Sequence, residues 1–363
     1  MLAAAVIVAA AAGVHGASAG RAAKGYVEPR EARYWEALAE GRVRCLLCPR
    51  KCTVPPGGRG YCEVRENRGG VYYTLTYGNP CAVHVDPIEK KPFNHFLPGT
   101  TSFSIAVAGC NLDCRFCQNW QISQARPEDL VNERLSPDEV VAAALKSGAA
   151  SVAYTYSEPT IFFEYMLDCA RLARSKGLRN VYHSNGYINP EPLKELCQYI
   201  DAANIDLKGF TEDYYRDMSN GSLAPVLRSL RILKEAGVHV EITTLLVPGR
   251  NDDPGAVRDM CRWIRQNLGD AVPLHFSRFH PEYRLMNLPP TPLESLERAR
   301  SIALEEGLLY VYIGNVPGHD AGSTYCPGCG SVLIRRIGYS VDVIDLRAGA
   351  CERCGRPIEG VWQ

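Results

Sequence analysis

The sequence lacks an excess of charge of either sign. Its 363 residues include 40 lysines and arginines and 40 aspartates and glutamates, so the formal net charge at pH 7 is zero. A protein that binds nucleic acid or an anionic membrane through its overall charge would be far from this balance. The composition therefore gives no strong indication of nucleic-acid binding, although a local basic patch would still suit RNA. No internal repeat of the main segments is apparent.

One apolar run needs explanation, and it stands at the N-terminus. Residues 1–19, MLAAAVIVAAAAGVHGASA, end in Ala17-Ser18-Ala19, which resembles the small-residue site where signal peptides are cleaved. The run lacks a basic start and a twin arginine, and it is short for a transmembrane span. Three interpretations stay open: an export signal or membrane tether, a flexible or weakly helical tail, and a misassigned start codon.

Cysteine, by contrast, is abundant: the chain contains 15. So many thiols are unusual in a cytosolic protein unless they bind metal. Most of them fall in tight groups, which favours metal sites over a disulfide framework. Four are solitary, and the last three of these lie in helical patterns and are expected to be small core residues: Cys81, Cys169, Cys197 and Cys261.

The most informative group is a C-x3-C-x2-C motif. Cys110, Cys114 and Cys117 stand in the string GCNLDCRFCQNW, directly after the apolar run of residues 104–108. A [4Fe-4S] cluster is normally held by four cysteines. Three thiolates on a compact loop would leave one iron free for a non-protein ligand, much as a catalytic zinc keeps an open position. The motif therefore predicts a site-differentiated iron–sulfur cluster.

This motif resembles the cluster loop of the radical SAM superfamily, which has an aromatic residue before the third cysteine, here Phe116. Three further strings narrow the resemblance: CQNW, DPIEKKPFNHFLPGT (86–100) and TYSEPT (155–160). Together they resemble the radical SAM member of the AmmeMemoRadiSam system, which is similar to the activating enzymes of glycyl-radical enzymes. The resemblance runs from about Arg44 to Gly360.

The resemblance implies a reaction and a set of partners. S-adenosylmethionine (SAM) would bind the open iron through its amino and carboxylate groups, and one electron would cleave it to a 5′-deoxyadenosyl radical that abstracts hydrogen from a substrate. The expected electron donor is flavodoxin- or ferredoxin-like, and the expected companions are Memo-type and Amme-type proteins. An oxygen-labile cluster that needs such a reductant favours a cytoplasmic location over export.

The alternation of apolar runs and helical patterns predicts an α/β fold with parallel strands and right-handed crossovers. Six such units would form a partial (β/α)6 barrel, the fold that the resemblance also implies, with its site at the carboxyl ends of the strands. The expected strands are 103–108, 151–156, 179–184, 201–207, 239–246, 272–279 and 309–314. The expected helices are 136–147, 160–175, 190–199, 223–236, 254–267 and 292–306.

We expect smaller regions on either side of this core, and a short helix over 28–40. The expected parts are an N-terminal tail, an N-terminal metal-binding region, the radical SAM core and a C-terminal zinc ribbon: 1–27, 28–95, 96–320 and 321–363.

The resemblance also indicates which residues contact SAM. The superfamily has a Gly-Gly-Glu segment after its second strand, where this chain has Tyr156, Ser157 and Glu158. The missing glycines affect the backbone part of that contact, whereas the Glu158 carboxylate can accept a hydrogen bond from the SAM ammonium. The alternative is that Glu158 only complements the dipole of the following helix.

Later strand ends supply the other expected contacts: Ser184, Asn185, Asp206, Lys208 and His280. Asp206 and Lys208 resemble the Asp-Leu-Lys segment of glycyl-radical activases and share one face of a strand. A buried acid and lysine would pair even without a role beside SAM. His280 matches an activase position that contacts SAM, and His275 is the weaker candidate, because a lone barrel histidine is often a core group.

Two cysteine quartets flank the core. Cys45, Cys48, Cys52 and Cys62 suit either zinc or a second iron–sulfur cluster, since spacing does not separate the two; disulfides would be the alternative in an exported protein. The second quartet consists of two C-x2-C pairs around a strand-like segment, which is typical of a zinc ribbon: Cys326, Cys329, Cys351 and Cys354.

The leading hypothesis is therefore a radical SAM enzyme with an unidentified substrate, for which a protein is favoured by the activase resemblance. Radical modification of a small molecule or RNA is the second hypothesis. A non-catalytic zinc-ribbon module on a degenerate barrel is the third, and the intact Cys110, Cys114 and Cys117 triad argues against it.

Overall fold

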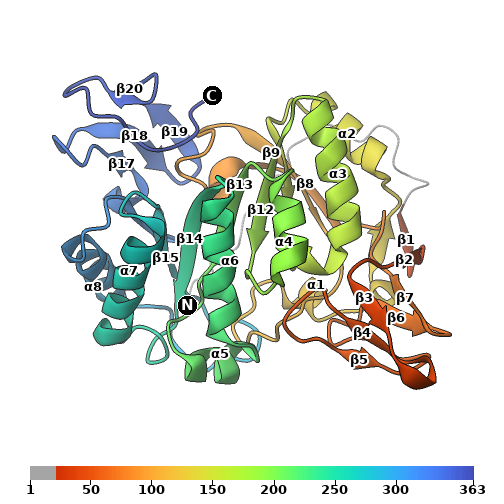
Figure 1. The fold of residues 1–363 in the computed structure, drawn as a ribbon. Coiled ribbons are helices and arrows are strands. Elements are labelled where there is room, and N and C mark those ends of the chain that lie inside the picture. Colours follow the sequence, from red (N-terminus) through yellow and green to blue (C-terminus); the bar gives the residue numbers. More distant parts are fainter. Residues whose placement is uncertain (1–21) are drawn as a thin grey trace, which may run out of the picture.

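A computed structural model describes residues 22–363, and one eight-stranded sheet forms its centre (Figure 1). The strand order is β16-β15-β14-β13-β12-β11-β9-β8, in which β9 to β16 run parallel and β8 pairs antiparallel with β9. The strands are β8 (Ala82–Pro87), β9 (Thr101–Ala106), β11 (Ser151–Tyr154), β12 (Arg179–Ser184), β13 (Ala202–Asp206), β14 (His239–Leu246), β15 (Leu274–Arg278) and β16 (Val311–Gly314).

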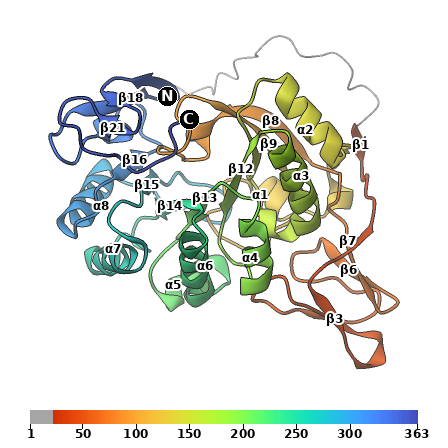
Figure 2. The same cartoon turned by 45° about the horizontal axis from the view of Figure 1, so that its top comes forward.

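Helices connect these parallel strands and cover one face of the sheet (Figures 1 and 2). The long ones are α2 (Pro137–Lys146), α3 (Phe163–Ser175), α4 (Pro190–Cys197), α6 (Leu223–Glu235), α7 (Pro254–Leu268) and α8 (Leu293–Glu305). The expected cap of α2 is present: the Ser136 side chain accepts a hydrogen bond from Glu139 N, and Pro137 opens the helix. The predicted alternation of strands and helices is therefore confirmed.

Three elements of this region were not expected from the sequence. β8 lies within the range expected for the N-terminal region (28–95), yet it completes the central sheet. The short helix α5 (Glu212–Ser219) has only eight residues and a mostly polar sequence, although it buries Tyr214, Tyr215 and Met218 on one face. Its start is fixed by Thr211, whose hydroxyl accepts from Tyr214 N. A minimal helix α1 (Trp120–Ser123) follows the cysteine loop.

The N-terminal region forms small antiparallel sheets at one end of the molecule (Figure 1). These are β2-β7-β6 and β3-β4-β5, and β1 pairs separately with β10. Their bounds are β1 (Ala22–Lys24), β2 (Arg30–Glu31), β3 (Trp35–Ala37), β4 (Val43–Cys45), β5 (Thr53–Val54), β6 (Arg65–Arg68), β7 (Val71–Thr74) and β10 (Val131–Glu133).

The helix predicted for residues 28–40 is wrong. β2 and β3 occupy this stretch, and the backbone of Tyr34 between them has a φ of 56°, which breaks any helix. Tyr34 packs its ring edge-on against Phe163 at 5.3 Å between centroids. Tertiary packing of this aromatic residue, not helical periodicity, therefore explains the apolar pattern.

The C-terminal segment packs beside the β16 edge of the sheet (Figures 1 and 2). It contains a three-stranded sheet, β17-β18-β19, and a hairpin, β20-β21. The bounds are β17 (Thr324–Tyr325), β18 (Val332–Ile337), β19 (Ser340–Val343), β20 (Leu346–Arg347) and β21 (Ala350–Cys351). The strand expected between the two cysteine pairs is confirmed as β18.

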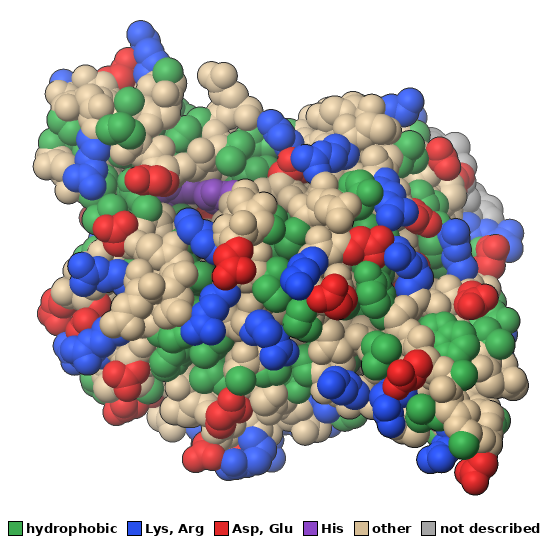
Figure 3. All heavy atoms as spheres, viewed as in Figure 1, with side chains coloured by type: hydrophobic (Ala, Val, Ile, Leu, Met, Phe, Trp, Pro, Cys, Tyr) green, Lys and Arg blue, Asp and Glu red, His purple; other side chains and the backbone are tan. Residues whose placement is uncertain are grey.

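Side chains of both signs share one face of the molecule, as the balanced composition suggests. Figure 3 shows lysine and arginine side chains interspersed with aspartate and glutamate across the face that it displays. Within residues 22–363, no helix is both long and apolar enough for a membrane span. The apolar run of residues 1–19 lies outside the described part of the chain.

A buried carboxylate holds the amino end of the sheet together. Glu241 on β14 is fully buried and accepts hydrogen bonds from the backbone N–H groups of Asn94 and His95 and from the rings of His239 and His275, the last at 2.6 Å. Burial opposes ionisation, but the two histidines hold the pKa of Glu241 below its usual range.

The neighbouring His95 extends this network into the C-terminal segment. Its ring nitrogens lie 2.6 Å from the Tyr312 hydroxyl and 2.6 Å from the Glu359 carbonyl oxygen. Burial lowers the pKa of His95 to about 4, so its ring is neutral at pH 7. The PFNHF string of the sequence therefore joins β14 to the end of the chain.

We predict that Glu241→Gln lowers the free energy of unfolding by about 3 kcal/mol, because it places an amide against donors that need an acceptor. Chemical denaturation measures the change. The matched control Glu235→Gln alters an exposed side chain at the end of α6 and should stay within about 0.5 kcal/mol of the wild type. A Glu241→Gln cost as small as that of the control would contradict this role.

Candidate functional site

The expected site residues converge at the carboxyl ends of the parallel strands, around one cavity of about 450 Å³. Its lining contains the cysteines of the C-x3-C-x2-C motif together with all but one of the residues expected to contact SAM. The residues from the expected set are Cys110, Cys114, Cys117, Tyr156, Ser157, Glu158, Ser184, Asn185, Asp206 and Lys208. Side chains as far apart in sequence as Cys110 and Lys208 thus face one space.

The cysteine loop follows β9, and backbone hydrogen bonds hold it in place. Asp113 N donates to Ser219 O at 3.1 Å, and Arg115 N donates to Met218 O at 2.9 Å. Both carbonyls belong to α5, so the helix missing from the sequence-based assignment holds the cysteine loop in place. Three thiols on this loop could hold three irons of a [4Fe-4S] cluster and leave the fourth without a protein ligand.

Glu158 joins the ends of two strands beside this loop. One carboxylate oxygen accepts from Thr160 N at 2.9 Å and Ser184 Oγ at 2.7 Å, and the other accepts from Asn185 N at 2.9 Å. Burial raises the pKa of Glu158, although these hydrogen bonds counteract it. The carboxylate caps the 3₁₀ turn at Pro159–Phe162, as the structural alternative expected, and it also lines the cavity with one acceptor site still free.

Asn185 links the Glu158 carboxylate to Cys110 of the motif. Its side-chain nitrogen lies 2.8 Å from Asn111 Oδ1 and 3.8 Å from Cys110 Sγ. Asn111 in turn donates to Tyr187 O at 2.7 Å. An amide that is fixed at both ends and points at a thiol sulfur is suited to orient that thiolate beside a metal.

Asp206 and Lys208 form the ion pair predicted from strand alternation, with 2.8 Å between Lys208 Nζ and Asp206 Oδ2. The sequence analysis missed the third member, His183, whose Nε2 lies 3.2 Å from the other Asp206 oxygen. Burial would raise the pKa of Asp206, but Lys208 and His183 hold it well below its usual range. His183 is on β12 next to Ser184, so strand adjacency was the only indication available.

Tyr156 adopts a backbone conformation that normally belongs to glycine, with a φ of 64°. It stands where the resemblance expects a glycine, so the backbone geometry persists with a different side chain. Such strain costs on the order of 1–3 kcal/mol and must be held by surrounding contacts. The Tyr156 hydroxyl donates to buried Asp86, and Lys91 Nζ lies 4.1 Å from its ring centre.

One cavity residue has an unused polar group. Ser157 Oγ is buried and has no hydrogen-bond partner among the described residues. A buried hydroxyl without a partner is costly unless a ligand or water satisfies it. Its position between Tyr156 and Glu158 therefore fits a polar cofactor bound in the cavity.

The structure places both candidate histidines of the sixth predicted strand away from this cavity. His280 is exposed two residues beyond β15 and does not line the cavity, because the chain turns at buried Phe279, whose N–H donates to Thr291 Oγ1. His275 is buried against Glu241 and stacks on Tyr312 at 5.0 Å, so it is a satisfied core histidine.

The sequence analysis also missed several cavity residues that carry no motif. They come from α1, from the strands, from the segment after β16, and from the turn between β18 and β19: Ser123, Thr243, Leu245, Ser277, Asn315 and Tyr339. Tyr339 lies between β18 and β19, so the C-terminal segment contributes to the same cavity.

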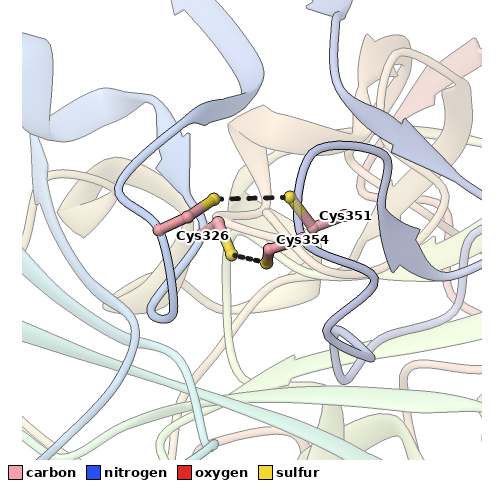
Figure 4. Close-up of side chains that lie close together, drawn as sticks. Cys326, Cys351 and Cys354 are labelled. Atoms are coloured by element: carbon pink, nitrogen blue, oxygen red, sulfur yellow. Dashed lines mark hydrogen bonds between the residues drawn. The ribbon is translucent and has the colours of Figure 1, made fainter.

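The two flanking quartets differ in geometry. In the C-terminal quartet, Sγ atoms of Cys326 and Cys354 lie 3.6 Å apart and those of Cys329 and Cys351 lie 3.7 Å apart. Figure 4 shows the side chains of Cys326, Cys351 and Cys354 close together. All four sulfurs lie within 4.8 Å of one another, which identifies a metal-binding group.

The N-terminal quartet surrounds a separate small cavity, also lined by Arg65, Tyr72 and Asn111. Its members are Cys45, Cys48, Cys52 and Cys62, and none of them forms a disulfide.

Comparisons with known proteins indicate the family of this chain. The model of the radical SAM superfamily matches residues 104–261. An uncharacterized protein of Methanocaldococcus jannaschii is 46% identical over 332 residues, which cover 91% of this chain and 99% of that protein. The pyruvate formate-lyase-activating enzyme of Listeria monocytogenes is 23% identical over 189 residues, 48% of this chain and 75% of that enzyme.

A solved structure of a radical SAM methyltransferase from Sphaerobacter thermophilus is similar with a TM-score of 0.47 and 16% identity, covering 65% of this chain and 71% of the other. The superfamily match includes all three motif cysteines and the strand ends that form the cavity from Glu158 to Lys208. The chain therefore belongs to the radical SAM superfamily.

Proposed function

We propose that this protein is a SAM-cleaving radical enzyme that abstracts hydrogen from a protein substrate, as glycyl-radical activases do. The observation that carries the proposal is the single cavity shared by Cys110, Cys114, Cys117 and the strand-end polar residues. A [4Fe-4S] cluster held by these thiolates would supply the electron that cleaves SAM to a 5′-deoxyadenosyl radical. The central sheet would serve as the partial (β/α)6 barrel around this chemistry.

The cavity residues would bind and orient SAM. Glu158 would accept a hydrogen bond from the SAM ammonium, and Ser157 Oγ has no partner within residues 22–363. The Asp206–Lys208 pair would fix one wall through charges that His183 keeps in place. These groups would position the cofactor, and the iron ligands would come from the motif cysteines alone.

A protein substrate is supported by the similarity to pyruvate formate-lyase-activating enzymes. We place the chain in the AmmeMemoRadiSam system on its sequence strings, with Memo-type and Amme-type proteins as companions and a flavodoxin- or ferredoxin-type donor in the cytoplasm. Beyond the N-terminal tail, we propose that the chain has three parts: a metal-binding region (28–95), the radical SAM core (96–320) and a zinc ribbon (321–363).

Zinc is the metal that we propose for the C-terminal quartet. A tetrahedral zinc ion with Zn–S bonds of about 2.3 Å separates its sulfurs by about 3.8 Å. The spacings of 3.6 Å and 3.7 Å agree with this geometry. Four cysteines would close the coordination shell, so the site would be structural.

Replacing Cys110, Cys114 and Cys117 together by Ala should abolish reductive SAM cleavage, because the iron that binds SAM would be lost. Formation of 5′-deoxyadenosine by anaerobically reconstituted protein measures the reaction, and electron paramagnetic resonance should lose the signal that SAM perturbs. Cys81→Ala removes a solitary cysteine and serves as the control. A SAM-responsive signal that survives the triple change would refute the assignment.

Asp206→Asn should keep the cluster and lower the rate of SAM cleavage by about 10²-fold, because a displaced Lys208 and His183 would let SAM shift by about 1 Å. Glu158→Gln and Lys208→Met are expected to behave alike. Iron content and the cleavage rate are measured on the same samples. Asp213→Asn, on the exposed face of α5, is the matched control. Wild-type rates in all three site variants would rule out the positioning role.

Cys329→Ser with Cys354→Ser should remove about one zinc per chain and loosen residues 325–363, because a small segment without a large core depends on its metal. Metal analysis and hydrogen exchange on the full chain test this, with Cys197→Ser as the control for a solitary thiol. Iron in place of zinc at this quartet, or unchanged protection without any metal, would overturn the zinc assignment.

A further inference from the structure

The N-terminal quartet is a built site that the proposed reaction does not use. Cys45 ends β4, and its N–H donates to Cys52 O at 2.9 Å, while Tyr61 N donates to Cys52 Sγ at 3.4 Å. With Cys48 and Cys62 these residues line one cavity. Three short strands and two turns thus bring four thiols to a common space.

The spacing of the sulfurs separates this quartet from a zinc site. Within residues 22–363, the C-terminal quartet is the only group of three or more potential metal ligands whose donor atoms all lie within 4.8 Å. The N-terminal sulfurs are therefore spread more widely than a single ion requires, since zinc holds its sulfurs about 3.8 Å apart. A cluster of several irons places one thiolate on each iron and so needs wider spacing.

The motif loop of Cys110, Cys114 and Cys117 provides a comparison within the same chain. Cys110, Cys114 and Cys117 match the radical SAM model and likewise do not gather within 4.8 Å. Neither group therefore has the close sulfur spacing of the C-terminal quartet.

Two buried donors point to an anionic, sulfur-rich occupant. Arg65 and Tyr72 line the cavity and are 1% and 0% exposed, yet Arg65 Nε and Tyr72 Oη have no hydrogen-bond partner among the described residues. The other end of the Arg65 guanidinium is anchored to Glu164 at 2.6 Å. Donors of this kind satisfy the thiolate and sulfide atoms of a cluster and tune its potential.

The quartet also lies next to the SAM site. A Cβ atom at Gly109, the residue before Cys110, would be 2.8 Å from the carbonyl oxygen of Cys62, so the two cysteine loops are in direct backbone contact. Asn111 lines the quartet's cavity and hydrogen-bonds to Asn185, which reaches Cys110 Sγ.

We propose that Cys45, Cys48, Cys52 and Cys62 hold a second iron–sulfur cluster, of the [4Fe-4S] class, that relays electrons to the SAM-binding cluster. One electron enters from a flavodoxin- or ferredoxin-type donor and one leaves to the neighbouring cluster, with no atom or proton transferred. The metal assignment stands on the quartet alone, whereas the relay rests on the function proposed above.

The test starts from full-length protein with Cys110, Cys114 and Cys117 replaced by Ala, reconstituted anaerobically with iron and sulfide. This protein should retain about four irons per chain and a reduced-cluster paramagnetic signal that SAM does not change. Adding Cys45→Ala and Cys62→Ala should remove that iron and leave the zinc content unaltered, whereas adding Cys81→Ala should remove none. About two zinc ions and no iron per chain in the triple variant would overturn the cluster.

Wild-type protein provides a second measurement that does not depend on the folding of any variant. It should bind about eight irons per chain, and reduction should give two signals broadened by mutual magnetic coupling. About four irons with a single SAM-sensitive signal would overturn the second cluster and keep the proposed function. About four irons with a SAM-insensitive signal would instead refute the SAM site and keep the second cluster.

Discussion

The hydrogen bonds that the buried Glu158 carboxylate accepts connect the main parts of the site. They tie the turn after β11 to Ser184 and Asn185 at the end of β12, which places the Asn185 amide between Asn111 and the Cys110 sulfur. A carboxylate this deeply buried needs those donors to remain satisfied. The strand ends and the cysteine loop therefore share one polar network, and displacing Glu158 would disturb both.

Much of this architecture follows from local sequence patterns. Apolar runs such as that of β14 and capped starts such as Ser136-Pro137 indicate the strand–helix alternation, and alternation along β13 indicates the Asp206–Lys208 pair. The α-helix expected over residues 28–40 does not form. The apolar pattern there reflects the packing of Tyr34 on Phe163 and not a helical face. Residues such as His183 stand in no motif and join the site only through the pairing of neighbouring strands.

The spacing of cysteines in the sequence does not show which kind of metal each of the three cysteine groups suits. C-x2-C pairs occur in both quartets. Only the C-terminal quartet has Sγ–Sγ distances that a single tetrahedral ion would give. The folded chain also sets the surroundings, since Arg65 and Tyr72 reach the N-terminal quartet from β6 and β7. Loop contacts then bring that quartet against Gly109, the residue before Cys110, a neighbourhood that no linear motif predicts.

In the proposed function, the loop of Cys110, Cys114 and Cys117 would leave one iron open to SAM. Electron–nuclear double resonance on the reduced wild-type protein tests it directly, with SAM labelled by nitrogen-15 at the amino group and oxygen-17 at the carboxylate. The account predicts hyperfine coupling of both labels to the cluster. Bound SAM that shows no coupling from either label would contradict it.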